Sequence, residues 1–332
     1  MQKKYIGLYV KDLSGHRKEY QNFIKEFIPA KIISLRELFF KREPVIFMMI
    51  EDSPLIYLFI SIFRALFKFQ TIGFLFRPLP VFNKKSLRMR IKYFFLSNLK
   101  KINAVKTLII IPSQVNDRFS EICDGWIYDM QLWDTSKEQI LTFNNSKMEK
   151  NNPFLQMIKP LANGRSVISA IGSQNKSKGF HIFAKLFIEN PDIRENFIFI
   201  FGGKLEGCSG ILKEFIEVGG LAIDRFITND ELINLYASSD LVWSLYDNEY
   251  DQASGIFGRA VQFGIPSVIR HGSLIDKLCK MERIPSLAFN PHEIDLQSLQ
   301  RFTKLDEIKG ERFKNNFKNI SINNLKKLID FN

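Results

Sequence analysis

Short apolar runs alternate with amphipathic segments along almost the whole chain, and this alternation constrains the fold more than any other feature of the sequence. In the N-terminal half, the strand-like runs are 5–10, 45–50, 71–76 and 106–111. Helical patterns fill the gaps between them at about 15–27, 55–68 and 85–101. Continuous apolar strands between amphipathic helices predict a parallel sheet that is covered by helices on both faces.

A second series of the same kind follows a stretch rich in Asn, Lys and Ser at 135–163, which we interpret as an inter-domain connection. Its strand-like runs are 166–171, 197–201, 221–226, 240–244 and 266–269. Its helical patterns lie near 178–189, 209–217, 230–237, 255–263 and 273–280. The chain is therefore predicted to be an α/β protein of two Rossmann-like domains that face each other across a cleft, with ligands at the carboxyl ends of the strands.

We place the first domain at 1–160 and the second at 161–308. The remainder, 309–332, is predicted to form a basic, polar helix, for which packing back on the first domain is one arrangement. The one candidate membrane span, 47–69, has an uninterrupted apolar run of about ten residues, short of the roughly 20 that a bilayer requires. We interpret it as a buried strand, a turn and a helix.

The formal net charge of +12 favours anionic partners, namely nucleic acid, an anionic membrane surface or phosphate-bearing substrates. The three cysteines, Cys123, Cys208 and Cys279, lie far apart and show no Cys-x-x-Cys spacing. This scatter argues against a disulfide scaffold or a structural zinc site. Nothing before the first strand resembles a signal peptide, so we expect a cytoplasmic protein.

Two loops of the second series combine glycine with lysine directly after a strand. In "AIGSQNKSKGF" the strand ends at Gly172, the loop carries Lys176 and Lys178, and a helix opens after Gly179. Backbone N–H groups at a helix N-terminus together with a lysine form an anion site, although a solvated lysine loop would show the same residues. In "FIFGGKLEGC", Gly203 and Lys204 repeat the pattern after the next strand. The alternative is that glycine stands there only because a larger side chain would not fit the turn.

The segment "DLVWSLYDNEYDQASGIFGRAVQFGIPSVI" continues the second series with an acidic loop and a glycine-bearing helix start. Asp251 precedes Ser254 and Gly255, and Arg259 follows one turn into the predicted helix. The start of this helix would direct its backbone N–H groups and dipole at an anion.

In this order and spacing, the motifs between about 165 and 275 resemble the donor-binding half of GT-B glycosyltransferases, specifically the retaining glycosyltransferase family 4. The resemblance implies a nucleotide-sugar donor in the C-terminal domain and an acceptor in the N-terminal domain. It also implies that Lys178 contacts the donor diphosphate. The arginine that the family usually carries after the strand-ending glycine is replaced by Ser173, and Lys176 could supply its charge.

The family also carries two glutamates eight residues apart around the helix start. The first aligns with Asp251, which would hold the hydroxyls of the transferred sugar. The second, which in the family holds the ribose hydroxyls, falls on Arg259, and arginine cannot accept a hydrogen bond. Arg259 is therefore expected to pair with Asp251 or a phosphate, or else to lie on an exposed helix face. The resemblance implies neither a metal nor a cofactor, and the Asp-x-Asp motif of metal-dependent GT-A enzymes is missing from the sequence.

The first loop of the N-terminal half reads "VKDLSGHRKEY", with Gly15 at a turn and His16 at the opening of a helix. The corresponding loop of GT-B enzymes approaches the donor phosphates and the acceptor. His16 is thus a candidate acceptor contact or catalytic base, and Gly15 a donor contact. The alternative is a helix-capping segment with an exposed histidine.

The segment 84–101 carries basic residues without an acid, interleaved with Tyr93, Phe94 and Phe95. A basic, aromatic, amphipathic helix is typical of an element that lies on an anionic membrane surface. The alternative is an apolar stripe that faces the core, with the charges merely solvated. Nucleic-acid binding would use a similar patch, but no signature of an RNA- or DNA-binding fold accompanies it.

We therefore expect a hexosyltransferase, metal-independent and retaining, that moves a sugar from a nucleotide sugar to a glycan acceptor. In the retaining mechanism the leaving diphosphate, held by Lys178 and the helix start at Ser254 and Gly255, assists attack on the same face of the sugar. The expected acceptor is a lipid-linked oligosaccharide of bacterial O-antigen or capsule synthesis, reached at the inner face of the cytoplasmic membrane. The alternatives are a non-catalytic nucleotide-sugar or glycan-binding protein and, less expected, a basic nucleic-acid-binding protein.

Overall fold

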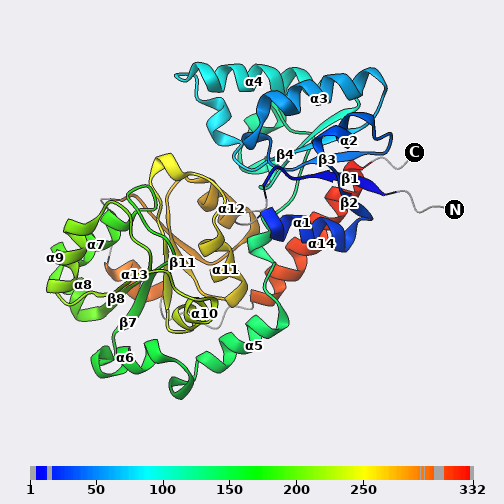
Figure 1. The fold of residues 1–332 in the computed structure, drawn as a ribbon. Coiled ribbons are helices and arrows are strands. Elements are labelled where there is room, and N and C mark those ends of the chain that lie inside the picture. The colour runs from blue at the N-terminus through cyan, green and yellow to red at the C-terminus, as the bar shows by residue number, and fades with distance from the viewer. Residues whose placement is uncertain (1–4, 13–16, 292, 295, 303–309, 330–332) are drawn as a thin grey trace. The chain divides into compact units, whose positions relative to one another are not determined.

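The chain forms two compact units, each built around one parallel sheet (Figure 1). The computed structural model describes residues 5–12, 17–291, 293–294, 296–302 and 310–329. The first unit comprises 1–130 with 316–332, and the second comprises 131–315. The predicted roles of the two halves, acceptor binding and donor binding, stay predictions.

The first unit contains a six-stranded parallel sheet in the order β2-β1-β3-β4-β5-β6. Its strands are β1 (Ile6–Tyr9), β2 (Ala30–Ile32), β3 (Val45–Phe47), β4 (Thr71–Leu75), β5 (Val105–Ile109) and β6 (Gly125–Trp126). Its helices are α1 (Arg17–Phe27), α2 (Leu35–Phe40), α3 (Pro54–Leu66), α4 (Leu87–Leu99) and most of α14 (Gly310–Leu328). The sequence pattern predicted four of these strands. It missed β2 and β6, which have three and two residues and therefore show no readable period.

The C-terminal helix α14 packs within the first unit beside β6. The hydroxyl of Ser321 accepts the backbone N–H of Tyr128 at 3.0 Å, and the amide of Asn324 donates to the carbonyl of Trp126 at 3.1 Å. The rings of Phe317 and Tyr128 lie 4.2 Å apart between centroids. These contacts make a segment from the end of the chain part of the first unit.

The second unit contains a six-stranded parallel sheet in the order β12-β11-β10-β7-β8-β9. Its strands are β7 (Ser166–Ile171), β8 (Phe197–Gly203), β9 (Leu221–Asp224), β10 (Leu241–Ser244), β11 (Ser267–Arg270) and β12 (Ser286–Phe289). Its helices are α5 (Lys137–Ser146), α6 (Pro153–Ala162), α7 (Phe180–Glu189), α8 (Pro191–Asn196), α9 (Ser209–Glu217), α10 (Asn229–Ala237), α11 (Gly255–Phe263), α12 (Leu274–Glu282) and α13 (Leu296–Phe302). The prediction of two parallel α/β domains is confirmed.

The polar stretch 135–163, which we interpreted as an inter-domain connection, lies in the second unit and contains the helices α5 and α6. Ser136 caps α5 by accepting the N–H of Gln139, whose side chain in turn accepts the N–H of Ser136 at 2.8 Å. This reciprocal capping box stabilises a helix start that polar composition alone conceals.

Alternation along β8 divides the core of the second unit into two layers. Phe197, Phe199 and Phe201 point to one face, where they pack with the buried rings of α7, and Ile198 and Ile200 point to the other. Successive side chains of a strand face opposite sides of its sheet, so a strand buried on both faces is apolar throughout. This rigid sheet positions the loops at its carboxyl edge.

Candidate functional site

Three loops meet at the carboxyl edge of the second sheet, around the switch point between β7 and β10, where ligands bind in open α/β sheets. Gln174, after β7, forms an isolated parallel bridge with Leu205, after β8. The N–H of Asp247, after β10, donates to the carbonyl of Ser177 at 3.0 Å. The structure thus brings together the loops from which the sequence predicted a donor site.

Two glycines allow the backbones of these loops to come this close. Gly203 has φ +148°, and a Cβ there would lie 2.0 Å from the carbonyl oxygen of Gly172. Gly179 has φ +77°, and a Cβ there would lie 2.0 Å from the carbonyl oxygen of Leu245. Any side chain at either position would push backbone against backbone, so these glycines set the shape of the loops.

Replacing Gly203 with alanine is expected to lower the free energy of unfolding by about 3 kcal/mol, since the clash adds to the unfavourable φ. Gly207 provides the control: its φ is +70°, and a methyl group added there would have no neighbouring atom within 4 Å. Gly207→Ala should cost about 1 kcal/mol, from the backbone conformation alone. Urea unfolding measures both, and equal losses would contradict the steric argument.

Lys178 is half-buried among these loops. Its ammonium donates to the carbonyl of Ser173 at 2.8 Å and lies 5.8 Å from the centre of the Tyr250 ring. Burial lowers the pKa of Lys178, while the charge of Glu206 acts in the opposite direction. Because its hydrogen-bond acceptor is a neutral carbonyl, the positive charge remains available to an anionic ligand.

The other two predicted lysines are placed differently. Lys176 is exposed in the loop after β7. The ammonium of Lys204 lies 3.5 Å from Oδ1 of Asp224, which also accepts the N–H of Leu205 at 2.9 Å. Lys204 therefore shares its charge with a carboxylate, and donor contacts by either lysine stay predictions.

Ser254 and Gly255 form the start of α11, as predicted. Oγ of Ser254 accepts the N–H of Phe257 at 3.4 Å and is hydrogen-bonded to the hydroxyl of Tyr246 at 2.7 Å. Gly255 lies against the side-chain amide of Gln131, which a Cβ would meet at 2.2 Å. The helix start is thus held in place, with its dipole available to an anion.

Asp251 already has two partners. One carboxylate oxygen accepts the N–H of Leu274 at 2.8 Å at the start of α12, and the other lies 2.9 Å from the guanidinium of Arg270. Both side chains are 13% exposed. Asp251 therefore orders the edge of the sheet, and its predicted contact with the sugar stays a prediction.

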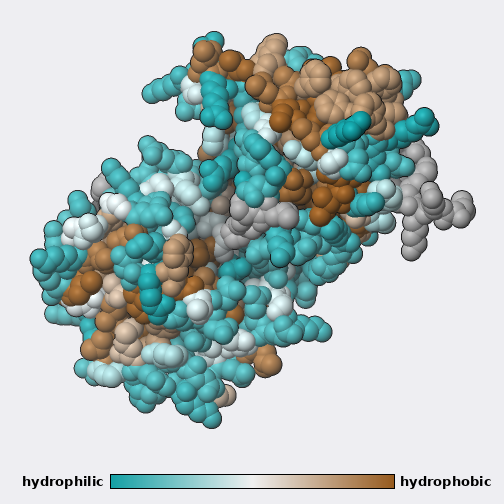
Figure 2. Space-filling view, in the orientation of Figure 1, coloured by the Kyte–Doolittle hydropathy of each residue, from teal (hydrophilic) through white to brown (hydrophobic). Residues whose placement is uncertain are grey.

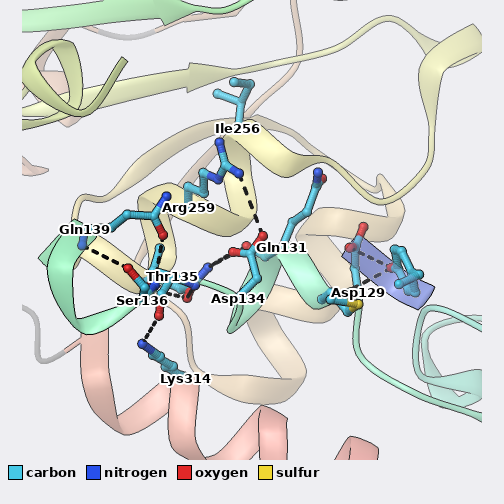
Figure 3. Close-up of polar contacts among 12 residues, drawn as sticks. Asp129, Gln131, Asp134, Thr135, Ser136, Gln139, Ile256, Arg259 and Lys314 are labelled. Carbon is cyan, nitrogen blue, oxygen red and sulfur yellow. Dashed lines mark hydrogen bonds and ion pairs between the residues drawn. The ribbon is translucent and has the colours of Figure 1, made fainter. Parts of the chain in front are cut away.

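Arg259 pairs with a residue that the sequence did not suggest. Its guanidinium lies 3.8 Å from Asp134, and its side chain is 19% exposed (Figure 3). The expectations of a pair with Asp251 and of an exposed helix face were wrong, because α11 directs this side chain toward the segment before α5. Nε of Arg259 is buried and has no hydrogen-bond partner among the described residues. The expected phosphate contact stays a prediction.

Gln262, one turn further along α11, forms hydrogen bonds to the segment 131–135. Its amide nitrogen donates to the carbonyl of Gln131 at 2.8 Å and to Asp134 at 3.0 Å. Its amide oxygen accepts the N–H and the hydroxyl of Thr135 at 3.0 and 2.6 Å, and Lys314 donates to the carbonyl of Thr135 (Figure 3). The helix that carries the candidate donor residues is thereby tied to the segment that opens the second unit.

No family model and no curated protein matches the chain. Solved structures do match over nearly its full length. The glycosyltransferase WaaG of lipopolysaccharide biosynthesis aligns at 10% identity over 99% of this chain and 100% of its own, with a TM-score of 0.53. HepE from Anabaena, solved with UDP and glucose, aligns at 13% over 98% of both chains, with a TM-score of 0.59. Sucrose-phosphate synthase from Thermosynechococcus elongatus aligns at 10% over 98% and 96%, with a TM-score of 0.58.

The chain has the GT-B fold. At identities of 10–13% the similarity shows the fold alone, and the activity has to be argued from the residues of this chain. In the first GT-B unit, Gly15 and His16 lie outside the described residues, so their predicted roles stay predictions.

The loop after β3 of the first unit is a further candidate site that the sequence did not indicate. Met49 has φ +53°, an unusual conformation for a side chain of its size. The guanidinium of Arg17 contacts both carboxylate oxygens of Asp52 at 3.0 Å. Glu51 accepts the N–H of Arg77 at 2.7 Å, and burial raises the pKa of Glu51 although Lys92 opposes this. A partly buried carboxylate at the carboxyl edge of a parallel sheet makes this loop a candidate site.

The predicted basic helix in 84–101 is α4, but its apolar residues divide between two sides. Leu96 and Leu99 are buried, so the core-facing alternative holds for them. Leu87, Ile91 and Phe94 are exposed, as are Arg88 and Arg90, whereas Lys92 is half-buried. None of the described helices is long and apolar enough to cross a bilayer.

Within the described ranges no three His, Cys, Asp or Glu residues gather in a way that could hold a metal ion, and metal independence stays a prediction. Arg270, directly after a buried strand, could have been noted by the rule that selected Lys178. Asp134 carried no sequence signal, because its role depends on a helix more than a hundred residues later.

Proposed function

We propose that this protein is a glycosyltransferase that transfers a sugar from a nucleotide-sugar donor, bound at the carboxyl edge of the second sheet. The observation that carries the proposal is the meeting of three strand-end loops on a GT-B fold, one of which carries Lys178 and another of which leads into α11. A half-buried ammonium and a helix N-terminus together suit a diphosphate. HepE, of similar fold, was solved with UDP and glucose, which supports a donor of this class.

In the proposed reaction the protein stabilises the charge of the leaving diphosphate and orients the transferred sugar. Lys178 and the first N–H groups of α11 take up the negative charge that develops on the leaving diphosphate. A carboxylate can accept about four hydrogen bonds, so Asp251 can hold a sugar hydroxyl while it keeps its contacts with Leu274 and Arg270. Arg259, which pairs with Asp134, would bring its positive charge to a phosphate. Retention of the anomeric configuration and independence of metal ions belong to this proposal.

The proposed acceptor is a lipid-linked oligosaccharide of bacterial surface polysaccharide synthesis, met at the inner face of the cytoplasmic membrane. The exposed cations and apolar residues of α4 support this choice. The fold of WaaG, a lipopolysaccharide glycosyltransferase, is compatible with it, whereas sucrose-phosphate synthase shares the fold too.

The experiment is a thermal-shift screen with UDP, GDP, dTDP and their sugars, followed by turnover with the nucleotide that binds. A ligand at a hundred times its Kd should stabilise the native protein by about 2.7 kcal/mol. Binding with hydrolysis or transfer supports the enzyme. Binding without turnover supports a nucleotide-sugar-binding protein, for which the exchange of an expected glutamate for Arg259 is the specific argument. If no nucleoside diphosphate binds, the proposal fails.

Asp251→Asn and Arg270→Gln separate a structural from a substrate role of the carboxylate. Both changes remove the same ion pair, so each should lower the free energy of unfolding by about 1–2 kcal/mol. Only Asp251→Asn should also lower kcat, by roughly 10²-fold, if the carboxylate holds the sugar in the transition state. Urea unfolding and steady-state kinetics measure the two effects. Equal kinetic losses in both variants would show that Asp251 acts only through the loop.

A further inference from the structure

A cavity of about 830 Å³ lies in the first unit, a size typical of small-molecule sites. It begins at the carboxyl ends of β3 and β4, beside Glu51 and Arg77, and continues between α3 and α4. Most of its lining is apolar, including Leu58 of α3 and Phe95 of α4. The cavity therefore combines a charged end at the edge of the sheet with a hydrocarbon-like interior.

Helix α3, one wall of the cavity, is apolar on its exposed side as well as on its buried side. Its inward face buries two polar side chains, Ser61 and Arg64, beside Tyr57 and Ile60. Its outward face carries an apolar stripe at helical spacing, formed by Leu55, Phe59, Ile62 and Leu66, of which Phe59 is 63% and Leu66 76% exposed. Figure 2 shows hydrophobic residues gathered on the surface over this helix. A soluble protein rarely exposes a contiguous stripe of this kind unless a partner covers it.

Helix α4, the other wall, adds a second exposed stripe of Leu87, Ile91 and Phe94. The two stripes meet at the cavity, because Leu55, Leu87 and Ile91 are exposed and also line it. The cavity thus opens onto the apolar surface, and a ligand could enter from a hydrophobic medium that covers both helices.

Cations outnumber anions along the cavity. Arg17 and Asp52 balance each other, whereas Arg77, Arg88 and Lys92 face a single further carboxylate, Glu51. Arg88 and Lys92 are one turn apart on α4, so they lie on the same side of the helix. Burial lowers the pKa of Lys92 and raises that of Glu51, so both groups are poorly solvated there. An anionic group beside the two α4 cations would receive charge-assisted hydrogen bonds.

We propose that this cavity binds the hydrocarbon chain of a lipid phosphate, with the phosphate at Arg88 and Lys92 and the chain between α3 and α4. The exposed stripes then contact an anionic bilayer, from which the chain enters. A second copy of this chain would cover the stripes equally well, but it would not use the excess of positive charge at the cavity. The binding of a lipid phosphate in the cavity does not depend on the proposed function. Only the further statement that this lipid is the acceptor rests on it.

Isothermal titration with decyl phosphate tests the cavity, with inorganic phosphate and decyl maltoside as probes for head group and chain alone. We expect saturable binding of decyl phosphate that exceeds that of either probe by at least about tenfold, because each buried methylene adds to the charge contacts. Ile91→Trp, which obstructs the opening, should weaken binding at least about tenfold. Phe94→Trp, on the same stripe but not lining the cavity, should change it less than about twofold.

Arg88→Gln and Arg90→Gln form a matched pair for the charge. Both residues are exposed on α4, but only Arg88 lines the cavity. Arg88→Gln should weaken decyl phosphate about five- to tenfold and leave decyl maltoside unchanged, and Arg90→Gln should affect neither. Equal effects within either matched pair, or no binding of decyl phosphate to the native protein, would overturn the proposal.

Sedimentation with vesicles that contain anionic phospholipid tests the surface. Phe59→Asp should abolish vesicle binding, and Phe226→Asp, which changes an even more exposed ring in the second unit, should not. Light scattering tests for a dimer. If the native protein is a dimer that Phe59→Asp converts to a monomer, and if it does not bind decyl phosphate, the surface is an interface with a second copy and the proposal is overturned. Nucleoside diphosphate binding is read separately by thermal shift, so a protein that binds decyl phosphate but no nucleotide retains this site and loses the proposed function.

Discussion

Lys178→Ala is expected to lower kcat/KM for the nucleotide sugar by about 10²–10³-fold, the range found when one preorganised donor to a developing anion is removed. The ammonium sits among the strand-end loops, is held by the carbonyl of Ser173 at 2.8 Å, and is partly desolvated. A charge that is already fixed and poorly hydrated stabilises the leaving diphosphate without reorganising during the reaction. Initial rates at varied donor concentration give both kcat and KM.

Lys185→Ala is the control for this variant, because Lys185 is exposed on α7 and lies two turns beyond Lys178. It changes the net charge equally and should leave kcat/KM within about twofold. Lys178→Arg should recover part of the activity if charge matters more than shape. A loss below about fivefold in Lys178→Ala would remove this lysine from the donor site.

Arg64→Met is expected to lower the free energy of unfolding by about 3–5 kcal/mol, the largest stability effect that we foresee. The Arg64 side chain is 0% exposed and donates to four backbone carbonyls and one hydroxyl. The acceptors are Leu38, Lys41, Glu43 and Gln70, at 2.5–3.0 Å, and the hydroxyl of Thr71 at 3.0 Å. Methionine fills similar space but donates nothing, so it leaves these buried acceptors unsatisfied.

Arg36→Met is the matched control, since Arg36 is exposed on α2, the helix whose end Arg64 binds. It should change stability by less than about 0.5 kcal/mol. Urea unfolding followed by circular dichroism measures both variants, and the first unit should be the one that melts early in Arg64→Met. A loss under about 1 kcal/mol would mean that water replaces the guanidinium at these carbonyls.

The parallel sheets and the donor loops could be predicted because both depend on local pattern. A strand that is apolar throughout must be buried on both faces, and glycine or lysine directly after it must lie at the carboxyl edge of the sheet. Gly172, Lys178 and Gly203 were found in this way, and the structure gathers their loops. The two- and three-residue strands were missed because so short a segment has no period to detect.

Partners across long sequence separations could not be predicted. The expected pairing of Arg259 with Asp251 was wrong because Asp134 approaches α11 from the segment before α5. The exposed side of α3 was missed for a related reason. Its apolar residues spread around the helix, and only the position of the sheet decides that Arg64 turns inward while Phe59 and Leu66 turn outward.

The two parallel sheets, most of the helices between their strands and the loops at their edges could be read from the sequence, because buried strands form apolar runs and the helices between them show a helical period. Only the tertiary structure shows which carboxylate each arginine meets, that Glu51 lies half-buried at a cavity, and that two helices present apolar stripes to their surroundings. The spacing of apolar residues along the chain indicates which residues are buried. The partner of a charged side chain, and the exposure of a helix face, depend instead on which distant segment packs against that residue or helix.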